Sequence, residues 1–207
     1  MIRQKLLIQK LFILAFALYI TPVFAQDIKS DFLERMKMVN AETSSIESDF
    51  VQERTLSIME DVLISSGKFY YKKPGLMKWD QLLPSPYYFI VNGNKVIRFD
   101  GNKRKVIPAS SPQVSHFKDF ILGTVNGTMF ESKEFLSTFS RIDDEVTVIL
   151  LPQQREMKKR IEKIQLIFAY DKMVLMELII FEKGGDSTAI YFSDQKFNSI
   201  SDSSIFN

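Results

Sequence analysis

Few side chains in this sequence could perform acid–base or nucleophilic chemistry. His116 is the only histidine, it lies in a short apolar stretch, and the sequence contains no cysteine. This composition excludes a Cys–His pair and the usual zinc ligand sets. The Gly-x-Ser-x-Gly motif that often presents a serine nucleophile is also absent. We therefore expect no catalysis by His116.

Acidic side chains give an equally weak indication of catalysis. A glycosidase would need two carboxyl groups facing one cleft. Asp49, Glu53 and Asp80 lie in segments with strand-like alternation, and Asp49 and Glu53 share the polar side of theirs. A solvated strand face accounts for them. Neither G-x-G-x-x-G nor a P-loop is present. The sequence predicts a protein that is not an enzyme and holds no cofactor or metal.

Residues 1–25 have the features of a secretory signal peptide. Three basic residues precede an apolar run over 11–20, which is too short to span a bilayer as a helix. Val23 and Ala25 are small enough to suit cleavage before Gln26. No cysteine follows the cut, so lipid attachment is not expected. The sequence thus predicts an exported, soluble protein.

Residues 26–207 fit one domain. Removing residues 1–25 takes away three of the 27 Lys and Arg and none of the 25 Asp and Glu, which leaves a net charge of −1. The basic run from Arg155 to Lys163 also contains Glu156 and Glu162, and we interpret it as a solvated turn. Such a balance gives no reason to expect a nucleic-acid partner. We expect a monomer.

Periodicity predicts a helix followed by an antiparallel meander of strands. Ile28, Phe32, Met36 and Val39 recur at helical spacing within a helix over 27–43. Two-residue alternation and turns such as Asn92-Gly93-Asn94 predict the strands. The expected strands lie over 45–56, 62–73, 76–82, 87–91, 95–99, 145–151, 164–170, 173–181 and 188–192.

Two stretches interrupt the expected strands. Residues 108–112 read Pro-Ala-Ser-Ser-Pro, and a short helix over 116–122 is expected to stop at Gly123. Residues 124–143 could be helical or irregular.

The content of Phe (18) and Met (9) is high. These side chains fill a large core, or they line a cavity for flexible apolar ligands. Composition alone does not separate the two.

The segment from Gly67 to Asp80 reads GKFYYKKPGLMKWD, and Phe50-x-Gln52 lies upstream of it. Together they resemble the LolA family of periplasmic carriers of outer-membrane lipoproteins. That family's pattern is F-x-Q, then a Gly-led strand into K-R-P-x-x-[FM]-x-W, then a proline and a strand into D/N-G. The resemblance covers essentially all of 26–207.

The resemblance implies an α+β fold that is mainly antiparallel β, an unclosed (half) β-barrel with short helices covering its concave face. It implies a periplasmic chaperone that shields the acyl chains of lipoproteins and carries them from the inner to the outer membrane. The partners would be an inner-membrane lipoprotein-releasing ABC transporter and an outer-membrane acceptor, either LolB-like or the membrane itself.

It also implies a cavity wall on the concave face. By strand parity Phe69 and Tyr71 share one face with Lys73, and Met77 and Trp79 share one face of the next strand. The acyl-chain cavity is expected to be lined by Phe50, Phe69, Tyr71, Met77, Trp79, Phe117, Phe120 and Ile121, the last three on a lid helix.

One position departs from the family pattern. The residue before Pro74 is Lys73, whereas the family usually has an arginine that holds the lid through hydrogen bonds to its backbone. We expect Lys73 to act as the lid gate, with a single-point donor in place of a planar fork.

Two other functions stay open. Lipid- or lipoprotein-sensing modules of the RseB type resemble the same fold but have an added domain. A secreted hydrolase would need a nucleophile–base pair, and no such pair is recognisable.

Overall fold

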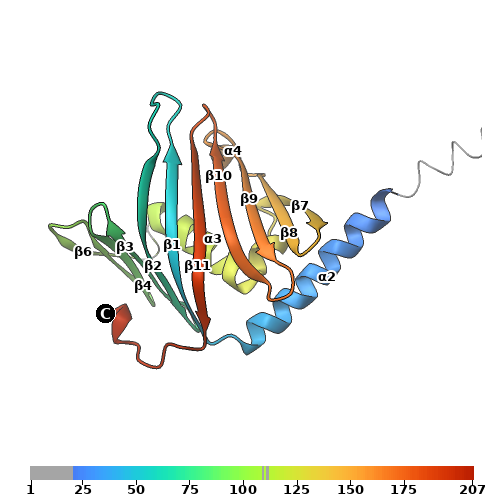
Figure 1. Ribbon diagram of the computed structural model, residues 1–207. Helices are drawn as coiled ribbons and strands as arrows, with labels where there is room; N and C mark the ends of the chain where they lie inside the picture. The colour runs from blue at the N-terminus through green and yellow to red at the C-terminus, as the bar shows by residue number, and fades with distance from the viewer. Residues whose placement is uncertain (1–20, 109, 111) are drawn as a thin grey trace, which may run out of the picture.

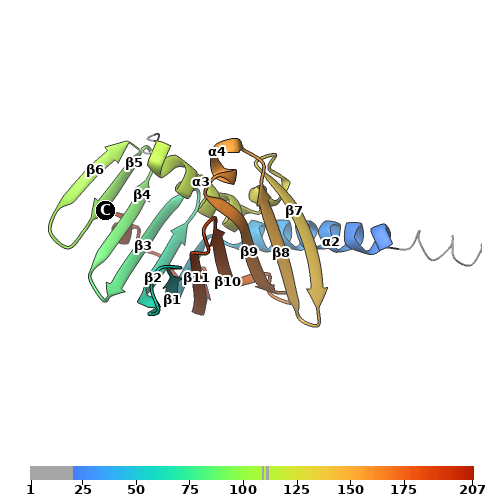
Figure 2. The same cartoon turned by 90° about the horizontal axis from the view of Figure 1, so that it is seen from above.

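A single antiparallel sheet of eleven strands forms the frame of the protein (Figure 1). The computed structural model describes residues 21–108, 110 and 112–207, and the side chains of all of these except 21–27 and 112–117. The strand order is β6-β5-β4-β3-β2-β1-β11-β10-β9-β8-β7, so β6 and β7 are edges and the sheet does not close. Seen from above, the sheet is curved, and α2 and α3 lie inside the curve (Figure 2). The predicted half-barrel is confirmed.

The strands are β1 (Ser45–Thr55), β2 (Leu63–Lys72), β3 (Leu76–Leu83), β4 (Tyr87–Asn92), β5 (Lys95–Phe99), β6 (Arg104–Pro108), β7 (Phe135–Ile142), β8 (Glu145–Pro152), β9 (Ile161–Ala169), β10 (Val174–Glu182) and β11 (Ser187–Phe197). The helices are α2 (Thr21–Glu42), α3 (Pro112–Asn126) and α4 (Arg155–Lys158), with 3-10 turns η1 (Thr128–Glu131) and η2 (Ser204–Phe206). All nine predicted strands are confirmed, and β6 and β7 are additional.

Helix α2 covers one half of the concave face through the apolar stripe predicted from its sequence. Phe32 is fully buried, and its ring lies 5.0 Å from that of Phe130 and 5.2 Å from those of Phe139 and Phe168. Met36, one turn later, is also buried. Aromatic edge contacts of this kind add to the burial of apolar area and fix the helix against β7 and β9.

Helix α3 is longer than predicted, and Gly123 does not end it. The helix continues to Asn126 and ends at Gly127, whose φ is +78°. Gly123 instead serves a close contact, because a Cβ there would lie 3.1 Å from the Cε of Met129. The residues after α3 form η1 and β7, which settles the stretch left open in the sequence.

Two connections contain more regular structure than the sequence indicated. Strand β6 (Arg104–Pro108) precedes the proline-rich break, and the basic run after Pro152, interpreted as a solvated turn, is partly helical. It forms the short helix α4 and then enters β9, since Lys158 N–H donates to the carbonyl of Gln154 and closes a helical turn.

The C-terminal segment packs on the outer, convex face of the sheet. Phe206 is fully buried against Ile90 and Ile97, whose side chains point away from the concave face. The side chain of Asn92 donates to the carbonyl of Phe206 at 3.1 Å. A second, smaller core therefore stabilises β4 and β5 from outside.

None of the helices within the described residues is long and apolar enough to cross a membrane. Helix α2 begins at Thr21, upstream of the expected cut before Gln26. Residues 1–20, which contain most of the expected signal peptide, lie outside the described residues.

We expect Gly67→Ala to destabilise the fold by about 1–3 kcal/mol because strands β2 and β3 leave no room for a methyl group. A Cβ on Gly67 would lie 2.0 Å from the carbonyl oxygen of Asp80. Gly75→Ala is the matched control, since its nearest neighbour would be a Leu122 methyl at 3.9 Å. Urea unfolding should show a change within about 0.5 kcal/mol for the control. Equal stability losses would contradict the steric explanation.

Candidate binding pocket

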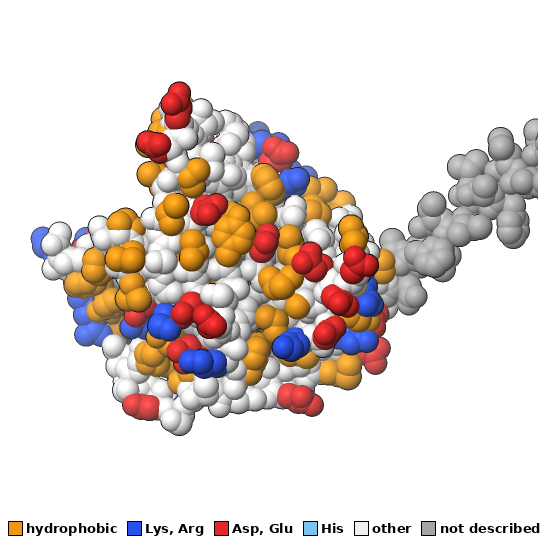
Figure 3. All heavy atoms as spheres, in the orientation of Figure 1, with side chains coloured by type: hydrophobic (Ala, Val, Ile, Leu, Met, Phe, Trp, Pro, Cys, Tyr) orange, Lys and Arg blue, Asp and Glu red, His pale blue; other side chains and the backbone are white. Residues whose placement is uncertain are grey.

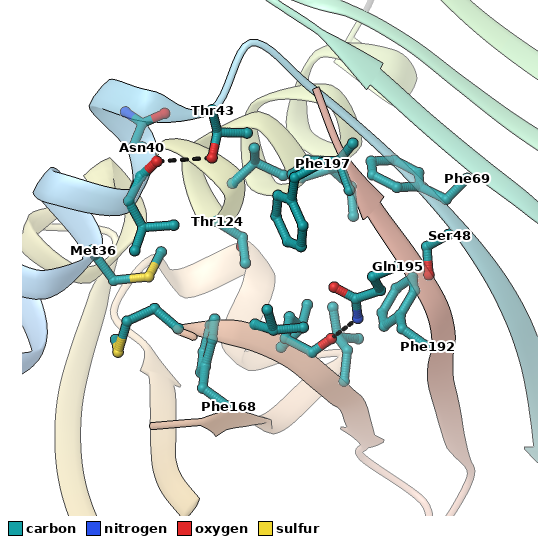
Figure 4. Close-up of a pocket in the computed structure, with 18 of the residues that line it drawn as sticks. Met36, Asn40, Thr43, Ser48, Phe69, Thr124, Phe168, Phe192, Gln195 and Phe197 are labelled. Atoms are coloured by element: carbon teal, nitrogen blue, oxygen red, sulfur yellow. Dashed lines mark hydrogen bonds between the residues drawn. The ribbon is translucent and has the colours of Figure 1, made fainter. Parts of the chain in front are cut away.

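An apolar pocket lies between the concave face of the sheet and helices α2 and α3 (Figure 4). The space it encloses, together with the open solvent at its mouth, is about 790 Å³. The pocket is lined by Met36, Val39, Asn40, Thr43, Ile46, Ser48, Phe69, Trp79, Ile121, Thr124, Val125, Phe168, Met173, Val174, Leu175, Leu178, Phe192, Gln195 and Phe197.

Aromatic rings form one wall of the pocket. The indole of Trp79 stacks on Phe50 with ring centres 3.9 Å apart, and Phe192 meets the same indole edge-on at 6.4 Å. Phe69 contacts Phe192 at 6.3 Å. Four strands, β1, β2, β3 and β11, therefore share one aromatic cluster, in which Phe69, Trp79 and Phe192 line the pocket and Phe50 supports Trp79 from behind. This wall offers a large apolar area at low cost in side-chain entropy.

No charged side chain lines the pocket among the described residues. Charged side chains of both signs are instead spread over the outer face of the sheet (Figure 3). Five lining residues are polar, namely Asn40, Thr43, Ser48, Thr124 and Gln195. A pocket of this composition suits apolar ligands, because it would exclude water from them, and it offers no charge that would neutralise a charged group.

The structure places the residues singled out from the sequence in two layers. Phe69, Trp79 and Ile121 line the pocket. Three others, Phe50, Tyr71 and Met77, are buried in the core and do not line it.

The remaining two lie on α3. Phe120 is partly buried, packs on Phe135 with ring centres 6.1 Å apart, and does not line the pocket. The side chain of Phe117 lies outside the described ones.

Much of the lining comes from segments that the sequence did not single out. Phe168, Leu178 and Phe192 belong to β9, β10 and β11, and Met36 belongs to α2. The sequence predicted these strands without indicating which of their side chains face the concave side, and only the curvature of the sheet brings these residues opposite Trp79.

Lys73 fixes the C-terminal end of α2. Its ammonium donates a short hydrogen bond to the backbone carbonyl of Asn40, and its own N–H donates to the carbonyl of Ser44 at 2.9 Å. A cation at the C-terminus of a helix also meets the negative end of the helix dipole. The tether thus reaches the first helix, whereas the sequence suggested the helix that contains Ile121.

Lys72 points the opposite way. Its ammonium donates to the carbonyl of Ser201 at 2.7 Å, in the segment that crosses the outer face. Two adjacent lysines therefore hold different parts of the chain on opposite faces of the sheet.

Tyr71 provides the corresponding tether for α3. Its hydroxyl donates to the side-chain oxygen of Asn126 at 3.1 Å, at the C-terminal end of the helix. Burial raises the pKa of Tyr71, so the hydroxyl keeps its proton and remains a donor at neutral pH. The end of β2 and the residue after it thus hold both helices that cover the pocket.

The N-terminal half of α2 is anchored separately. Tyr170 donates to Asp31 at 2.8 Å, and the guanidinium groups of Arg35 and Arg141 lie 4.2 and 3.3 Å from the centre of the Tyr170 ring. Burial opposes the ionisation of Asp31, but hydrogen bonds from Tyr170 and Arg35 outweigh it and lower its pKa below 3.8. The hydrogen bond between Tyr170 and ionised Asp31 therefore contributes its full stability at pH values above the ordinary pKa of an aspartate. That contribution is lost as the pH falls through the lowered pKa of Asp31.

Comparison with solved structures supports the fold. The complex of MucA and MucB from Pseudomonas aeruginosa has a TM-score of 0.51 and 13% sequence identity, and the match covers 86% of this chain and 60% of that one.

Two relatives named outer-membrane lipoprotein carrier protein match in sequence. The protein from Pseudoalteromonas translucida is 24% identical over 193 residues, which cover 92% of this chain and 86% of the relative. The protein from Francisella philomiragia is 28% identical over 171 residues, covering 80% and 76%. Residues 41–207 match the profile of the family described as outer membrane lipoprotein carrier protein LolA. The chain therefore belongs to the LolA family.

Proposed function

We propose that the protein binds the acyl chains of lipoproteins in the pocket and carries them through the periplasm from the inner to the outer membrane. The observation that supports this most directly is the uncharged pocket beneath two tethered helices. Both named relatives are lipoprotein carriers. Residues 1–25 would direct export and be removed before Gln26.

Solvent physics explains why such a carrier is needed. Each methylene of an acyl chain costs about 0.8 kcal/mol to expose to water, so a chain of sixteen carbons costs roughly 12 kcal/mol. An acylated protein does not cross an aqueous compartment at that cost. A pocket in which the acyl chain contacts Trp79, Phe192 and Met36 in place of water removes most of this free-energy cost.

The same carrier must also release its cargo. The helices and the acyl chain compete for one apolar wall, so the ligand must offset the cost of displacing the helices. Binding is thereby weakened to a level that permits release. The proposed donor is a lipoprotein-releasing ABC transporter of the inner membrane, and the acceptor is a LolB-like receptor or the outer membrane itself.

The second candidate function is the one left open by the sequence, a lipid- or lipoprotein-sensing module of the RseB type. The two functions differ in the fate of the bound ligand. A carrier transfers a bound acylated peptide to acceptor vesicles, whereas a sensor retains it. Transfer measured with a fluorescent triacylated peptide distinguishes them.

We expect the protein to bind the neutral probe N-phenyl-1-naphthylamine and a triacylated cysteine peptide to displace it. Trp79→Ala should weaken probe binding and lower the free energy of unfolding by about 3–5 kcal/mol, because a buried, stacked ring is lost. Phe99→Ala is the control, since that ring stacks on Tyr88 outside the pocket. Fluorescence titration measures probe binding, and urea unfolding measures stability. Probe binding no stronger than to an unrelated β-protein would contradict the proposal.

Lys73→Leu should favour the open state of α2. Losing a charged hydrogen bond to the Asn40 carbonyl costs the closed state on the order of 1.5–3 kcal/mol, roughly a tenfold to hundredfold change in the open population. Amide exchange in the last turns of α2 should accelerate. The variant should take up acylated peptide readily and transfer it poorly.

Lys72→Leu is the matched control, because it removes the same charge from the outer face. Lys73→Arg should behave like the natural protein. Equal transfer defects at both lysines, or none at Lys73, would show that the gate lies elsewhere.

A further inference from the structure

Charge is distributed unevenly over the protein. Residues 95–105, which cover β5, the turn after it and the start of β6, have a net charge of +4, whereas the remainder of 26–207 has a net charge of −5. Figure 3 shows Lys and Arg side chains at the end of the molecule where Figure 1 places β6. The basic residues of this hairpin are all exposed, and we call them the basic edge: Lys95, Arg98, Lys103, Arg104 and Lys105.

Two of these cations continue the row of side chains that forms the aromatic wall of the pocket. Cross-strand pairing joins Phe69 to Trp79 and Trp79 to Phe89. The same row continues from Phe89 to Arg98 and ends with Lys105 on β6. Directly paired residues share one face of a sheet. Arg98 and Lys105 therefore lie on the concave side, the side that holds the pocket.

The chain itself supplies little negative charge to these cations. Like charges directly opposite each other, as Arg98 and Lys105 are, destabilise a pair of strands. Within the described part of the chain, no side chain of the basic edge forms an ion pair. Asp100 is the only acidic residue of the hairpin. A hydrogen bond from the Lys103 N–H, together with attraction from Lys105 and Arg98, lowers the pKa of Asp100, but one carboxylate does not balance five cations.

Protection of an exposed strand edge does not account for so many cations. Charged side chains do keep edge strands from pairing with other chains. The opposite edge, β7, has a single charged residue, Arg141, and its guanidinium lies 3.3 Å from the centre of the Tyr170 ring. An edge of this sheet thus does not require a basic cluster.

We propose that the basic edge docks the protein on the surface of an anionic phospholipid bilayer. Two of its cations lie on the concave side and two, Lys95 and Arg104, on the convex side, with Lys103 in the turn between the strands. A small anion would contact one or two of them, whereas a bilayer presents many phosphates to an edge that approaches it. Val106 adds an apolar contact at the headgroup level, because its side chain is 59% exposed.

This inference goes beyond the proposed function, because it concerns a surface outside the pocket. Three strand spacings, about 15 Å along the sheet, separate β6 from Trp79 on β3. In the proposed carrier, docking through the basic edge would hold the pocket near the membrane that supplies or receives the cargo.

The test is sedimentation of the exported protein with vesicles that contain no lipoprotein. One set of vesicles is phosphatidylcholine alone, and the other is phosphatidylcholine and phosphatidylglycerol in equal parts. The protein should bind the anionic vesicles and not the neutral ones, and added salt should weaken the binding. Equal binding to both sets, or binding to neither, would overturn the inference.

Two double variants assign the binding to the basic edge. Each basic residue near an anionic surface contributes about fivefold to binding, so Arg98→Gln with Lys105→Gln should weaken it about thirtyfold. The free energy of unfolding should not fall, because a like-charge pair is removed. Arg155→Gln with Lys158→Gln is the matched control, since it removes two exposed basic residues from α4 and changes the net charge equally. Its binding should change little.

An equal loss of binding in the two double variants would show that net charge, and not the basic edge, determines the binding. Tighter binding to a poly-aspartate peptide or to single-stranded DNA than to the anionic vesicles would assign the edge to another partner and overturn the inference. None of these outcomes affects the displacement of N-phenyl-1-naphthylamine by an acylated peptide, so the proposed function is tested separately.

Discussion

The unclosed sheet is the constraint on which the rest of the structure depends. Eleven strands curve without pairing β6 to β7, so the concave face is left as a broad apolar surface. Water cannot cover such a surface without a large free-energy cost. Helices α2 and α3 cover it instead, and each contributes apolar side chains such as Phe32 and Ile121. The pocket exists because two helices cover a curved sheet incompletely.

The cover is held more tightly at some points than at others. The N-terminal half of α2 is packed through Phe32 and anchored through Asp31 and Tyr170. Near the pocket, the end of α2 is held by hydrogen bonds from Lys73 and Asn198, and the end of α3 by one from Tyr71. Individual hydrogen bonds contribute little net stability compared with a buried aromatic cluster. In the proposed carrier, this distribution would let the ends that border the pocket move while the frame stays folded.

The two faces of the sheet are covered by different parts of the chain. The convex face is covered over β4 and β5 by the C-terminal segment, with Phe206 buried, and the concave face retains the pocket. Strand alternation makes this division possible, since adjacent residues serve opposite faces. Lys72 and Lys73 illustrate it, because one holds the C-terminal segment and the other holds α2.

The sequence by itself determined the strand segments, the amphipathic stripe of α2 and the family. Local periodicity and turn residues are sufficient for these, and Lys95–Phe99 has the predicted bounds. The sequence did not reveal that α3 continues through Gly123. A glycine is needed there because the side chain of Met129 packs closely against it, and helix propensities do not take such a packing contact into account. Only the tertiary structure decided which apolar residues line the pocket and which helix Lys73 holds. The pocket lining depends on the curvature of the sheet, which brings Trp79 and Phe192 together although they are more than a hundred residues apart. The helix that Lys73 holds depends on how the end of β2 meets the end of α2. Periodicity has no information about such distances.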